Sequence, residues 1–396
     1  MGKRVLSGMR PTGPLHIGHW EGVLKNWVQL QSEHDCYFFS ADWHVLTTDY
    51  ERASDVGANV VDNVADWIAC GLDPEKSVLF VQSDIKEHAE LYLLLSMLVP
   101  IPWLERNPTY REQLRELRRT HVPPPLVQKI NKELKSRAKK ELGQRLQAVV
   151  SAPEDAEPAE TLMDLLPEIE AVLSKDLFAR LKQAATARDL STLGFLSYPV
   201  LQTADIIIYK GDYVPVGEDQ MPHVELSRDI VRRFNALYGE TFPEPQGLLT
   251  PTPRLLGTDE RKMSKSYDNA VFLGDSAEET LAKVKPMKTD PARMRMTDPG
   301  DPDKCNVFSW HKLYSSESEQ EDCATKCRAA AFGCMDCKMI LAENLNRELA
   351  PIRERRAALL EEPNRIKEII ADGAGKARAV ATETIKEVRE AMKIHG

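Results

Sequence analysis

The sequence predicts an α/β fold, in which helices cover a parallel, Rossmann-like sheet and a helical region follows toward the C-terminus. Short apolar runs suited to buried strands alternate with longer amphipathic segments over the first part of the chain, as in parallel sheets covered on both faces. From about residue 276 the pattern becomes almost entirely helical. The chain has 396 residues, 42% of them hydrophobic and 29% charged, which is enough for two ordinary soluble domains.

The first strand, turn and helix are expected within residues 4–30. Residues 4–9 form a short apolar run, residues 10–14 contain prolines and a glycine, and the apolar positions from Leu15 onward fall mostly on one helical face. Unpaired backbone N–H groups at such a turn make an anion site. The chain places His16, Gly18 and His19 there, with both imidazoles on one face. Taken alone, this H-x-G-H sequence is equally consistent with two surface histidines.

Strands and helices continue to alternate after this unit. Further strands are predicted at residues 36–40 and 78–82 and from residue 214. The helices between them are predicted at 55–72 and 88–99, and the segment that starts at 214 runs into a helix reaching residue 238. Residues 255–274 form a loop, and the last helices are predicted as three separate ones, at 339–360, 364–371 and 374–394.

The composition restricts where the chain works and what it binds. No apolar run approaches the length of a membrane span, and the N-terminus lacks the apolar core of a signal peptide, so we expect a cytoplasmic protein without a membrane partner. The formal net charge is −9, so overall charge does not indicate a nucleic-acid partner, and any basic surface must be local.

A second signature of nucleotide handling lies far downstream, at Lys262-Met263-Ser264-Lys265-Ser266. H-I-G-H followed by K-M-S-K-S on a chain of this length resembles the class I aminoacyl-tRNA synthetases. The segments SGMRPTGPLHIGH, YPVLQTADI, VPVGEDQ and GTDERKMSKS further resemble bacterial tryptophanyl-tRNA synthetases, over nearly the whole chain apart from an insertion. The resemblance implies a catalytic domain at 1–275 that binds ATP and tryptophan, and a helical anticodon-binding domain at 276–396.

The implied reaction joins tryptophan to ATP as tryptophanyl-adenylate, releases pyrophosphate, and then transfers tryptophan to the 3′-terminal ribose of tRNA(Trp). The carboxylate of the amino acid is itself the nucleophile, so the protein has to align the reactants and stabilise negative charge on the phosphates. His16 and His19 would supply hydrogen-bond donors, and Lys262 and Lys265 would supply cations from a loop able to close and open.

The remaining ATP contacts follow from the resemblance alone. ATP would be contacted by Arg10, Pro11, Thr12, Gly18, His19, Gly217, Glu218, Asp219, Leu255, Lys262, Met263, Ser264, Lys265 and Ser266. Within this set Leu255 would pack on the adenine, and the acidic residues suit ribose hydroxyls or the substrate ammonium better than the triphosphate. Mg²⁺ bound to ATP is expected, with few protein ligands.

Selection of tryptophan is assigned by the resemblance to Asp205, which would accept the indole N–H. Indole has one donor and no acceptor, so a selective site needs one buried acceptor. Phenylalanine would leave that acceptor unpaired, and tyrosine would differ in shape and hydrogen bonding. Tyr198 and Gln202, one turn apart, would form walls of the site, and Gln220 would face the amino acid.

The cysteines suggest a metal centre. Five of the seven crowd into residues 305–337, which in a cytosolic chain is more typical of metal ligands than of disulfides. The resemblance extends to a subgroup with a [4Fe–4S] cluster, here on Cys305, Cys327, Cys334 and Cys337. The gap between Cys305 and Cys327 is one residue shorter than that subgroup's pattern, and Cys323 is spare. A tetrahedral Zn²⁺ on the four cysteines from Cys323 to Cys337 remains the alternative.

Residues 113–187 are interpreted as a helical insertion in the catalytic domain. Its first half is dense in lysine and arginine, and an acidic stretch rich in proline and alanine follows at 151–160. One interpretation is a solvated surface elaboration. The other is that the basic half contacts the tRNA backbone, which would make binding depend on salt.

Several other functions remain open from the sequence. A tyrosyl-tRNA synthetase would share the fold and both signatures, and a small nucleotidyltransferase also uses H-x-G-H but on a shorter chain. An iron–sulfur redox protein or a catalytically silent paralogue is disfavoured by the presence of both signatures together with Asp205. The family resemblance also implies a homodimer.

Overall fold

The computed structural model describes residues 2–50, 53–108, 110–111, 124–151, 162–185, 192–249 and 255–395. Contacts divide the chain into two compact units, of which the first is Met1–Leu98 together with Val200–Gly396 and the second is Val99–Pro199. The C-terminal helices therefore belong to the same unit as the sheet. The arginines at 115–119 and most of the acidic stretch at 151–160 lie outside the described residues.

A five-stranded parallel sheet forms the centre of the first unit, in the order β3-β2-β1-β4-β5. Its strands are β1 (Arg4–Met9), β2 (Asp35–Ser40), β3 (Ser77–Val81), β4 (Tyr213–Val216) and β5 (Gln246–Leu249). This confirms the predicted α/β fold with a parallel sheet, and β1 begins and ends where its apolar run does. Because all five strands are parallel, their carboxyl ends meet at one edge, which is where such sheets bind ligands.

The helix after β1 is less regular than its apolar pattern predicts. It consists of α1 (Ile17–His19), a π-helical turn η1 (Trp20–Leu24) and α2 (Lys25–Leu30). Single π-helical turns inside helices occur often at functional sites. Here the wider turn follows the H-I-G-H sequence directly.

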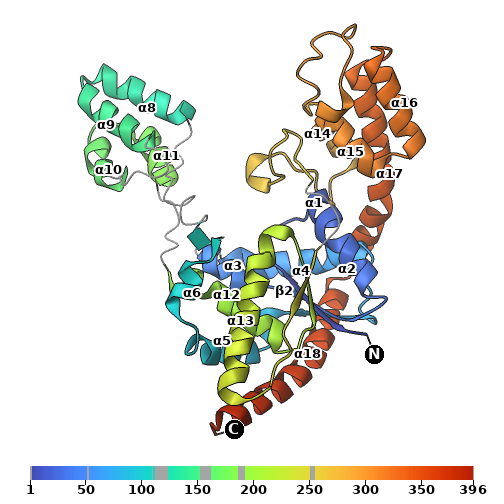
Figure 1. Ribbon diagram of the computed structural model, residues 1–396. Coiled ribbons are helices and arrows are strands. Elements are labelled where there is room, and N and C mark those ends of the chain that lie inside the picture. The colour runs from blue at the N-terminus through green and yellow to red at the C-terminus, as the bar shows by residue number, and fades with distance from the viewer. Residues whose placement is uncertain are drawn as a thin grey trace. The chain divides into compact units, whose positions relative to one another are not determined.

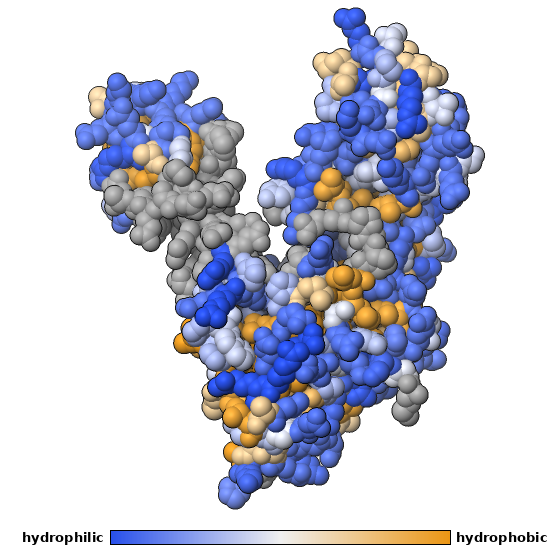
Figure 2. Space-filling model, viewed as in Figure 1, coloured by the Kyte–Doolittle hydropathy of each residue, from blue (hydrophilic) through white to orange (hydrophobic). Residues whose placement is uncertain are grey.

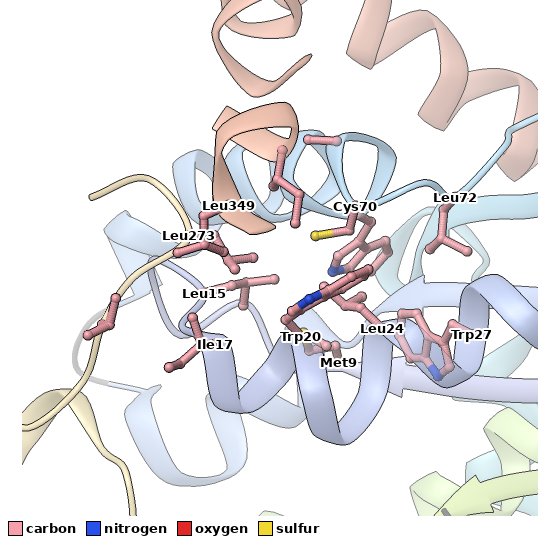
Figure 3. Close-up of a cluster of buried hydrophobic side chains, with 14 of the residues drawn as sticks. Met9, Leu15, Ile17, Trp20, Leu24, Trp27, Cys70, Leu72, Leu273 and Leu349 are labelled. Atoms are coloured by element: carbon pink, nitrogen blue, oxygen red, sulfur yellow. The ribbon is translucent and has the colours of Figure 1, made fainter. Parts of the chain in front are cut away.

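The main hydrophobic core joins residues from very different parts of the chain. Figure 3 shows Leu15 and Ile17 from the H-I-G-H turn close to Leu273 and Leu349, with Trp20 and Leu24 beside them. Leu15, Ile17, Leu273 and Leu349 are each at most 2% exposed. The start of the chain, the segment after K-M-S-K-S and a C-terminal helix therefore share one core.

Two long C-terminal helices, α17 (Cys334–Glu361) and α18 (Pro363–Met392), pack within the same unit as the sheet and are drawn in orange to red in Figure 1. The predicted break between 371 and 374 is wrong, because α18 continues through Gly373. This glycine lies directly against the backbone of Leu79 in β3, where a Cβ would collide with the Leu79 carbonyl. Gly373 therefore marks a close helix–strand contact and does not end the helix.

The second unit contains a small helical bundle of its own. Its helices are α8 (Pro124–Ser136), α9 (Lys140–Val150), α10 (Leu162–Glu170) and α11 (Lys175–Ala185). Their buried apolar side chains form a separate cluster with one another, including Ile130, Leu146, Leu165 and Leu181. The amphipathic pattern of the insertion is thus satisfied within the insertion itself.

The structure describes further helices in both units. They are α3 (Asp42–Asp49), α4 (Ala53–Ala69), α5 (Glu87–Ser96), α6 (Ile101–Glu105), α12 (Leu193–Ile207), α13 (Met221–Tyr238), α14 (Ala277–Val284), α15 (Asn306–Tyr314) and α16 (Glu317–Arg328). Within the described ranges, none of the helices combines the length and the apolar character needed to cross a membrane.

Candidate functional site

The H-I-G-H turn follows the carboxyl end of β1. The ring centroids of His16 and His19 are 3.8 Å apart. A Cβ on Gly18 would come within 2.9 Å of His16 Nδ1, so the arrangement of the rings depends on glycine at this position. The turn presents two imidazoles together at the ligand-binding edge of the sheet.

The segment after K-M-S-K-S is hydrogen-bonded directly to this turn. The backbone N–H of Ile17 donates to the carbonyl of Val271 at 2.9 Å, and the backbone N–H of Leu273 donates to the carbonyl of Leu15 at 2.9 Å. His16 and Phe272 pair as an isolated antiparallel bridge. Two segments far apart in sequence are therefore held side by side, and this brings the K-M-S-K-S loop to the H-I-G-H turn.

Lys265 brings a positive charge to the turn. Its Nζ lies beside Gly13, where a Cβ would be 3.3 Å away. Burial lowers the pKa of Lys265 to about 8, and the carboxylate of Asp66 opposes that shift. Among the described residues, this buried Nζ has no hydrogen-bond acceptor. A buried ammonium without an acceptor is costly, so this arrangement favours an anionic ligand.

The two histidines are neutral near pH 7. Burial lowers the pKa of His16 to about 4 and that of His19 to about 3, with a smaller contribution from the charge of Lys265. Nδ1 of His19 accepts the backbone N–H of His16 at 3.1 Å, so the neutral ring carries its proton on Nε2. His19 can therefore donate one N–H to a ligand without bearing a charge.

Asn269 fixes the shape of the K-M-S-K-S loop. Its side-chain oxygen accepts the backbone N–H of Ser264 at 2.8 Å, and its side-chain nitrogen donates to Asp259 at 2.7 Å and to the carbonyl of Lys262 at 3.1 Å. Asn269 is 2% exposed, and Met263 is also buried, whereas the side chain of Lys262 is exposed. Asn269 thus fixes the backbone of the loop by hydrogen bonds. Of the two lysines, Lys262 is exposed, whereas Nζ of Lys265 is buried.

A buried ion pair lies behind the turn. Asp66 on α4 accepts from Nε of Arg356 on α17 at 2.5 Å, and it also accepts a hydrogen bond from the backbone of Leu15. Burial raises the pKa of Asp66, and Arg356 opposes that rise. A residue of the C-terminal helices thereby holds the carboxylate that faces Lys265.

Asp205 lies at the centre of a second buried group. It is 1% exposed, and His88 Nδ1 and His44 Nε2 lie 2.5 Å and 2.9 Å from its two carboxylate oxygens. Nε2 of Gln82 donates to both oxygens at 2.8 Å. The carboxylate that the sequence predicts as one buried acceptor is therefore already surrounded by hydrogen-bonding side chains.

The charge of Asp205 is maintained by these neighbours. Burial alone would raise the pKa of Asp205, but the contacts with His88 and His44 outweigh burial and lower that pKa to about 2. Gln82 is oriented because its Oε1 accepts the backbone N–H of Trp43 at 3.1 Å, so its amide nitrogen faces the carboxylate. An ionised, oriented acceptor of this kind suits recognition of a single N–H donor.

The other predicted ligand residues are distributed along the same edge of the sheet. Arg10 donates to Thr48 and forms an ion pair with Asp49 at 3.6 Å. Gly217 and Glu218 follow the carboxyl end of β4, as the H-I-G-H turn follows β1. Their roles in ligand binding remain predictions.

The remaining residues of the predicted set are placed as follows. Pro11 is buried, Thr12 is exposed, and Leu255, Gln202 and Gln220 are half-buried. Tyr198 shares α12 with Gln202 but belongs to the second compact unit. The side chains of Asp219 and Ser266 lie outside the described residues.

The cysteine-rich region gathers around the ends of three helices. Cys305 precedes α15, Cys327 lies near the end of α16, and Cys334 and Cys337 begin α17. Arg293, which is 8% exposed, donates to Cys327 Sγ at 3.5 Å.

A tighter group is also present among the described residues of this region. One ligand atom each from His311, Cys323 and Cys337 lie within 4.8 Å of one another. His311 therefore joins the cysteines as a possible metal ligand that their spacing alone did not indicate.

Two of the four site residues missed in the sequence share one signal. His44 and Gln82 come just after β2 and β3, at the carboxyl ends of parallel strands, and could have been found by that position. His88 and Asn269 carry no such signal. His88 acts through a hydrogen bond to Asp205, far away in sequence, and Asn269 acts through hydrogen bonds within its own folded loop.

Comparison with known proteins identifies a family. The chain matches the family model described as tRNA synthetases class I (W and Y) over residues 2–130 and 145–350. The tryptophan–tRNA ligase of Aquifex aeolicus is 48% identical over 413 aligned residues, which cover 99% of this chain and 100% of the relative. The tryptophan–tRNA ligase of Thermotoga maritima is 44% identical over 393 aligned residues, which cover 99% of this chain and 99% of the relative.

Solved structures show the same similarity. Tryptophanyl-tRNA synthetase from Campylobacter jejuni, complexed with ADP and tryptophan, aligns with a TM-score of 0.73 at 29% identity and covers 99% of this chain and 100% of its own. A tyrosyl-tRNA synthetase from Archaeoglobus fulgidus, complexed with L-tyrosine, aligns with a TM-score of 0.54 at 18% identity over 90% of each chain. The latter similarity concerns the fold alone.

Proposed function

This chain belongs to the class I tRNA synthetases of the tryptophan and tyrosine type, and on that basis we propose that it acts as a tryptophan–tRNA ligase. It activates L-tryptophan with ATP to form tryptophanyl-adenylate and pyrophosphate, and transfers the tryptophan to the 3′-terminal ribose of tRNA(Trp). The observation that carries the proposal is Lys265, a buried cation lacking an acceptor in the described chain, aimed at a turn with two neutral imidazoles.

In the first step, the amino acid's carboxylate attacks the α-phosphorus of ATP and pyrophosphate leaves. No protein nucleophile is required, and catalysis comes from alignment and from stabilising charge on the phosphates. Lys265 provides the charge, and the Nε2–H of His19 provides a neutral donor. A phosphate placed between them would satisfy Nζ of Lys265 and favour its protonated form.

Other contacts with ATP come from the family correspondence. Arg10, Gly217 and Glu218 lie at the carboxyl edge of the sheet and would contact the nucleotide. Leu255 would pack on the adenine, and Lys262, exposed on the loop, would close over the pyrophosphate. Mg²⁺ would accompany ATP through its phosphates and waters, with few protein ligands.

Asp205 would select tryptophan by accepting the indole N–H. The group around Asp205 supports this role because it keeps the carboxylate ionised and fixes its direction. His44 is the more exposed of the two histidines that contact Asp205, at 13% for its side chain against 0% for His88. We infer that the indole N–H replaces the His44 contact, while Gln82 and His88 continue to hold the carboxylate.

The cysteine-rich region would hold a [4Fe–4S] cluster on Cys305, Cys327, Cys334 and Cys337. The surroundings fit such a group: Arg293 donates to Cys327, and a Cβ at Gly300 would come within 2.6 Å of the Cys327 sulfur, so glycine keeps space beside that ligand. Buried cations beside thiolates offset the negative charge of an iron–sulfur cluster. When bound, the cluster would act as a structural link for the surface that reads the anticodon.

Zinc remains the alternative occupant, and one variant distinguishes the two. Cys323 is spare in the iron–sulfur assignment but a ligand in the zinc site on the four cysteines from Cys323 to Cys337. Among the described residues, Cys323 lies in one group with Cys337 and His311, which supports that alternative. We expect Cys323→Ser to purify brown with unchanged iron and sulfide content, and Cys334→Ser to lose both. A colourless wild-type protein that contains zinc, and loses it in Cys323→Ser, would decide for zinc.

The reaction itself is tested by pyrophosphate exchange into ATP with each of the twenty amino acids. We expect tryptophan to support exchange and tyrosine and phenylalanine to be far poorer. Exchange with tyrosine but not with tryptophan would assign the chain to the tyrosine branch of the family. The family also suggests a cytoplasmic location and a homodimer. Sedimentation of the purified protein would test the homodimer.

A further inference from the structure

The helical bundle of the second unit carries a basic face whose role the reaction has not explained. Residues 124–141, which cover α8 and the start of α9, contain six basic side chains and two acidic ones. The chain as a whole has a formal net charge of −9, so this local excess of positive charge is opposite in sign to the net charge of the protein. A polyanion would be repelled by the average surface and attracted here.

The geometry of α8 separates its two faces completely. Leu126, Ile130 and Leu134 are buried in the bundle's own core. Lys129, Lys132 and Lys135 recur every third residue, are exposed, and fall on the opposite face of the helix. Because the apolar face is satisfied within the bundle, the lysine face is turned to solvent and available to a partner.

The carboxylates of the bundle do not neutralise these lysines. Glu133 accepts from the backbone N–H of Ser174, the residue before α11, at 2.8 Å, and from Arg137 at 3.1 Å. Glu168 on α10 is held by Arg145 at 2.9 Å. Among the described residues, no ion pair is formed by Lys129, Lys132 or Lys135. Figure 2 shows much of the surface of this unit over α8 and α9 as hydrophilic.

The spacing of these lysines suits a phosphate backbone. Residues three apart on a helix rise by about 4.5 Å along its axis, and lysine stems are long and flexible, so the three ammonium groups can adjust to a row of phosphates. Lysine binds phosphate as a point charge and needs no fixed angle. Such contacts confer affinity and salt dependence without reading sequence.

We propose that Lys129, Lys132 and Lys135 form a docking face for the sugar–phosphate backbone of the tRNA that this enzyme charges. The proposal rests on the proposed function, which supplies the RNA. It assigns the insertion a part in tRNA binding but none in amino-acid activation, since adenylate formation requires no tRNA. Lys139 and Lys140, exposed just before and at the start of α9, would add positive charge close by in the sequence.

The test compares Lys129→Gln/Lys132→Gln/Lys135→Gln with wild type. Binding of labelled tRNA(Trp) transcript is measured from low to high NaCl, together with tryptophan-dependent pyrophosphate exchange. We expect about 5- to 50-fold weaker binding at low salt, and a salt slope smaller by roughly 2 to 3, since each phosphate contact contributes about 0.7–0.9. Pyrophosphate exchange should be unchanged.

Two control variants make the result specific. Lys129→Arg/Lys132→Arg/Lys135→Arg keeps the charge and should restore wild-type binding and slope. Lys175→Gln/Arg180→Gln removes exposed charge from α11 of the same bundle and should leave both unchanged. A glutamine triple variant with wild-type affinity and slope overturns the docking face, as does an arginine triple variant that fails equally.

The same measurements separate this inference from the proposed function. If wild type shows no tryptophan-dependent exchange, the proposed function fails, and with it the identity of the RNA. If exchange is present and the glutamine variant binds tRNA normally, only the docking face fails. Thermal melting of all variants, expected to coincide because the substituted side chains are exposed, excludes unfolding as the cause of weaker binding.

Discussion

At the scale of single residues, the site buries charged groups at a cost in free energy and does not give all of them hydrogen-bond partners. Lys265 is the clearest example, because burial lowers its pKa to about 8 and the described chain gives its Nζ no acceptor. A side chain kept in such a position lowers the stability of the folded state. Residues of this kind are expected where function demands them.

Lys265→Met should therefore stabilise the protein while removing activity. The unfolded chain binds a proton at Lys265 up to its ordinary pKa of 10.5, whereas the folded chain loses that proton near pH 8. The wild type therefore carries the cost of the buried charge below pH 8, and loses that cost as pH rises toward 10.5. We expect Lys265→Met to gain roughly 1 kcal/mol at pH 7, after allowance for the partial exposure of the group.

Urea unfolding at pH 7 and at the highest pH that keeps the protein folded measures this effect. Lys262→Met is the matched control, because Lys262 is exposed on the same loop and its loss should leave the free energy of unfolding within about 0.5 kcal/mol. The rate of pyrophosphate exchange should fall about 100- to 1000-fold in Lys265→Met, as for loss of a transition-state donor. A destabilised Lys265→Met with nearly normal exchange would contradict the assignment.

Asp205→Asn is the corresponding test of amino-acid selection. The new amide NH₂ would face donors on Gln82, His44 or His88, so the group would lose at least one hydrogen bond and about 1–3 kcal/mol of stability. The kcat/KM for tryptophan should fall at least 10-fold, while the KM for ATP stays within about twofold. Both constants are obtained from pyrophosphate exchange, and a normal KM for tryptophan would remove Asp205 from the binding site.

The sequence predicted these residues to different extents, for a physical reason. The H-I-G-H turn and Lys265 could be predicted because their backbone geometry and charge depend on residues that are adjacent in the sequence. Asn269 could not, since its importance lies in three hydrogen bonds that exist only once the loop has folded. Asp205 was predicted as one buried acceptor, but the partners that keep it ionised come from other helices.

At the scale of secondary-structure elements, α18 shows that a glycine can mark close packing as well as the end of a helix. Strand β1 was predicted to the residue because an apolar run is a local signal, whereas the continuity of α18 was not. The sequence predicted a break between residues 371 and 374, yet Gly373 in that gap is the point at which the helix touches the backbone of β3. Whether a glycine ends a helix or allows close packing depends on a neighbour that the local sequence does not contain.

Two substitutions in α18 distinguish a glycine needed for close packing from a glycine that only lowers helix propensity. Gly373→Ala should destabilise the protein by about 1–3 kcal/mol, because its methyl group would collide with the Leu79 carbonyl. Gly375→Ala, two residues further on, meets no atom within 4 Å and should stabilise by roughly 0.5–1 kcal/mol through helix propensity alone. Urea unfolding of both variants measures the two signs, and a stabilising Gly373→Ala would show that α18 does not lie against β3.

At the scale of the whole molecule, the C-terminal helices are part of the catalytic unit. Side chains of α17 and α18, including Leu349 and Ile366, are buried in the same cluster as Leu15 and Trp67. Arg356 on α17 also holds Asp66, whose carboxylate lies near Lys265. The compact units therefore do not divide where the helical pattern begins at residue 276.

A chain that ends at residue 275 should consequently fail to fold as an independent ATP-binding domain. Its core would expose the surfaces that Leu349 and Ile366 cover, and Asp66 would lose its ion pair with Arg356. The control is the full chain with 124–185 replaced by a short Gly–Ser linker, because the buried apolar side chains of that segment contact one another. We expect the control to melt cooperatively near the wild-type temperature and the truncated chain to show no cooperative melt. A cooperative transition in the truncated chain, shifted upward by ATP, would mean that the sheet is stable without α17 and α18, and that the C-terminal helices serve tRNA binding alone.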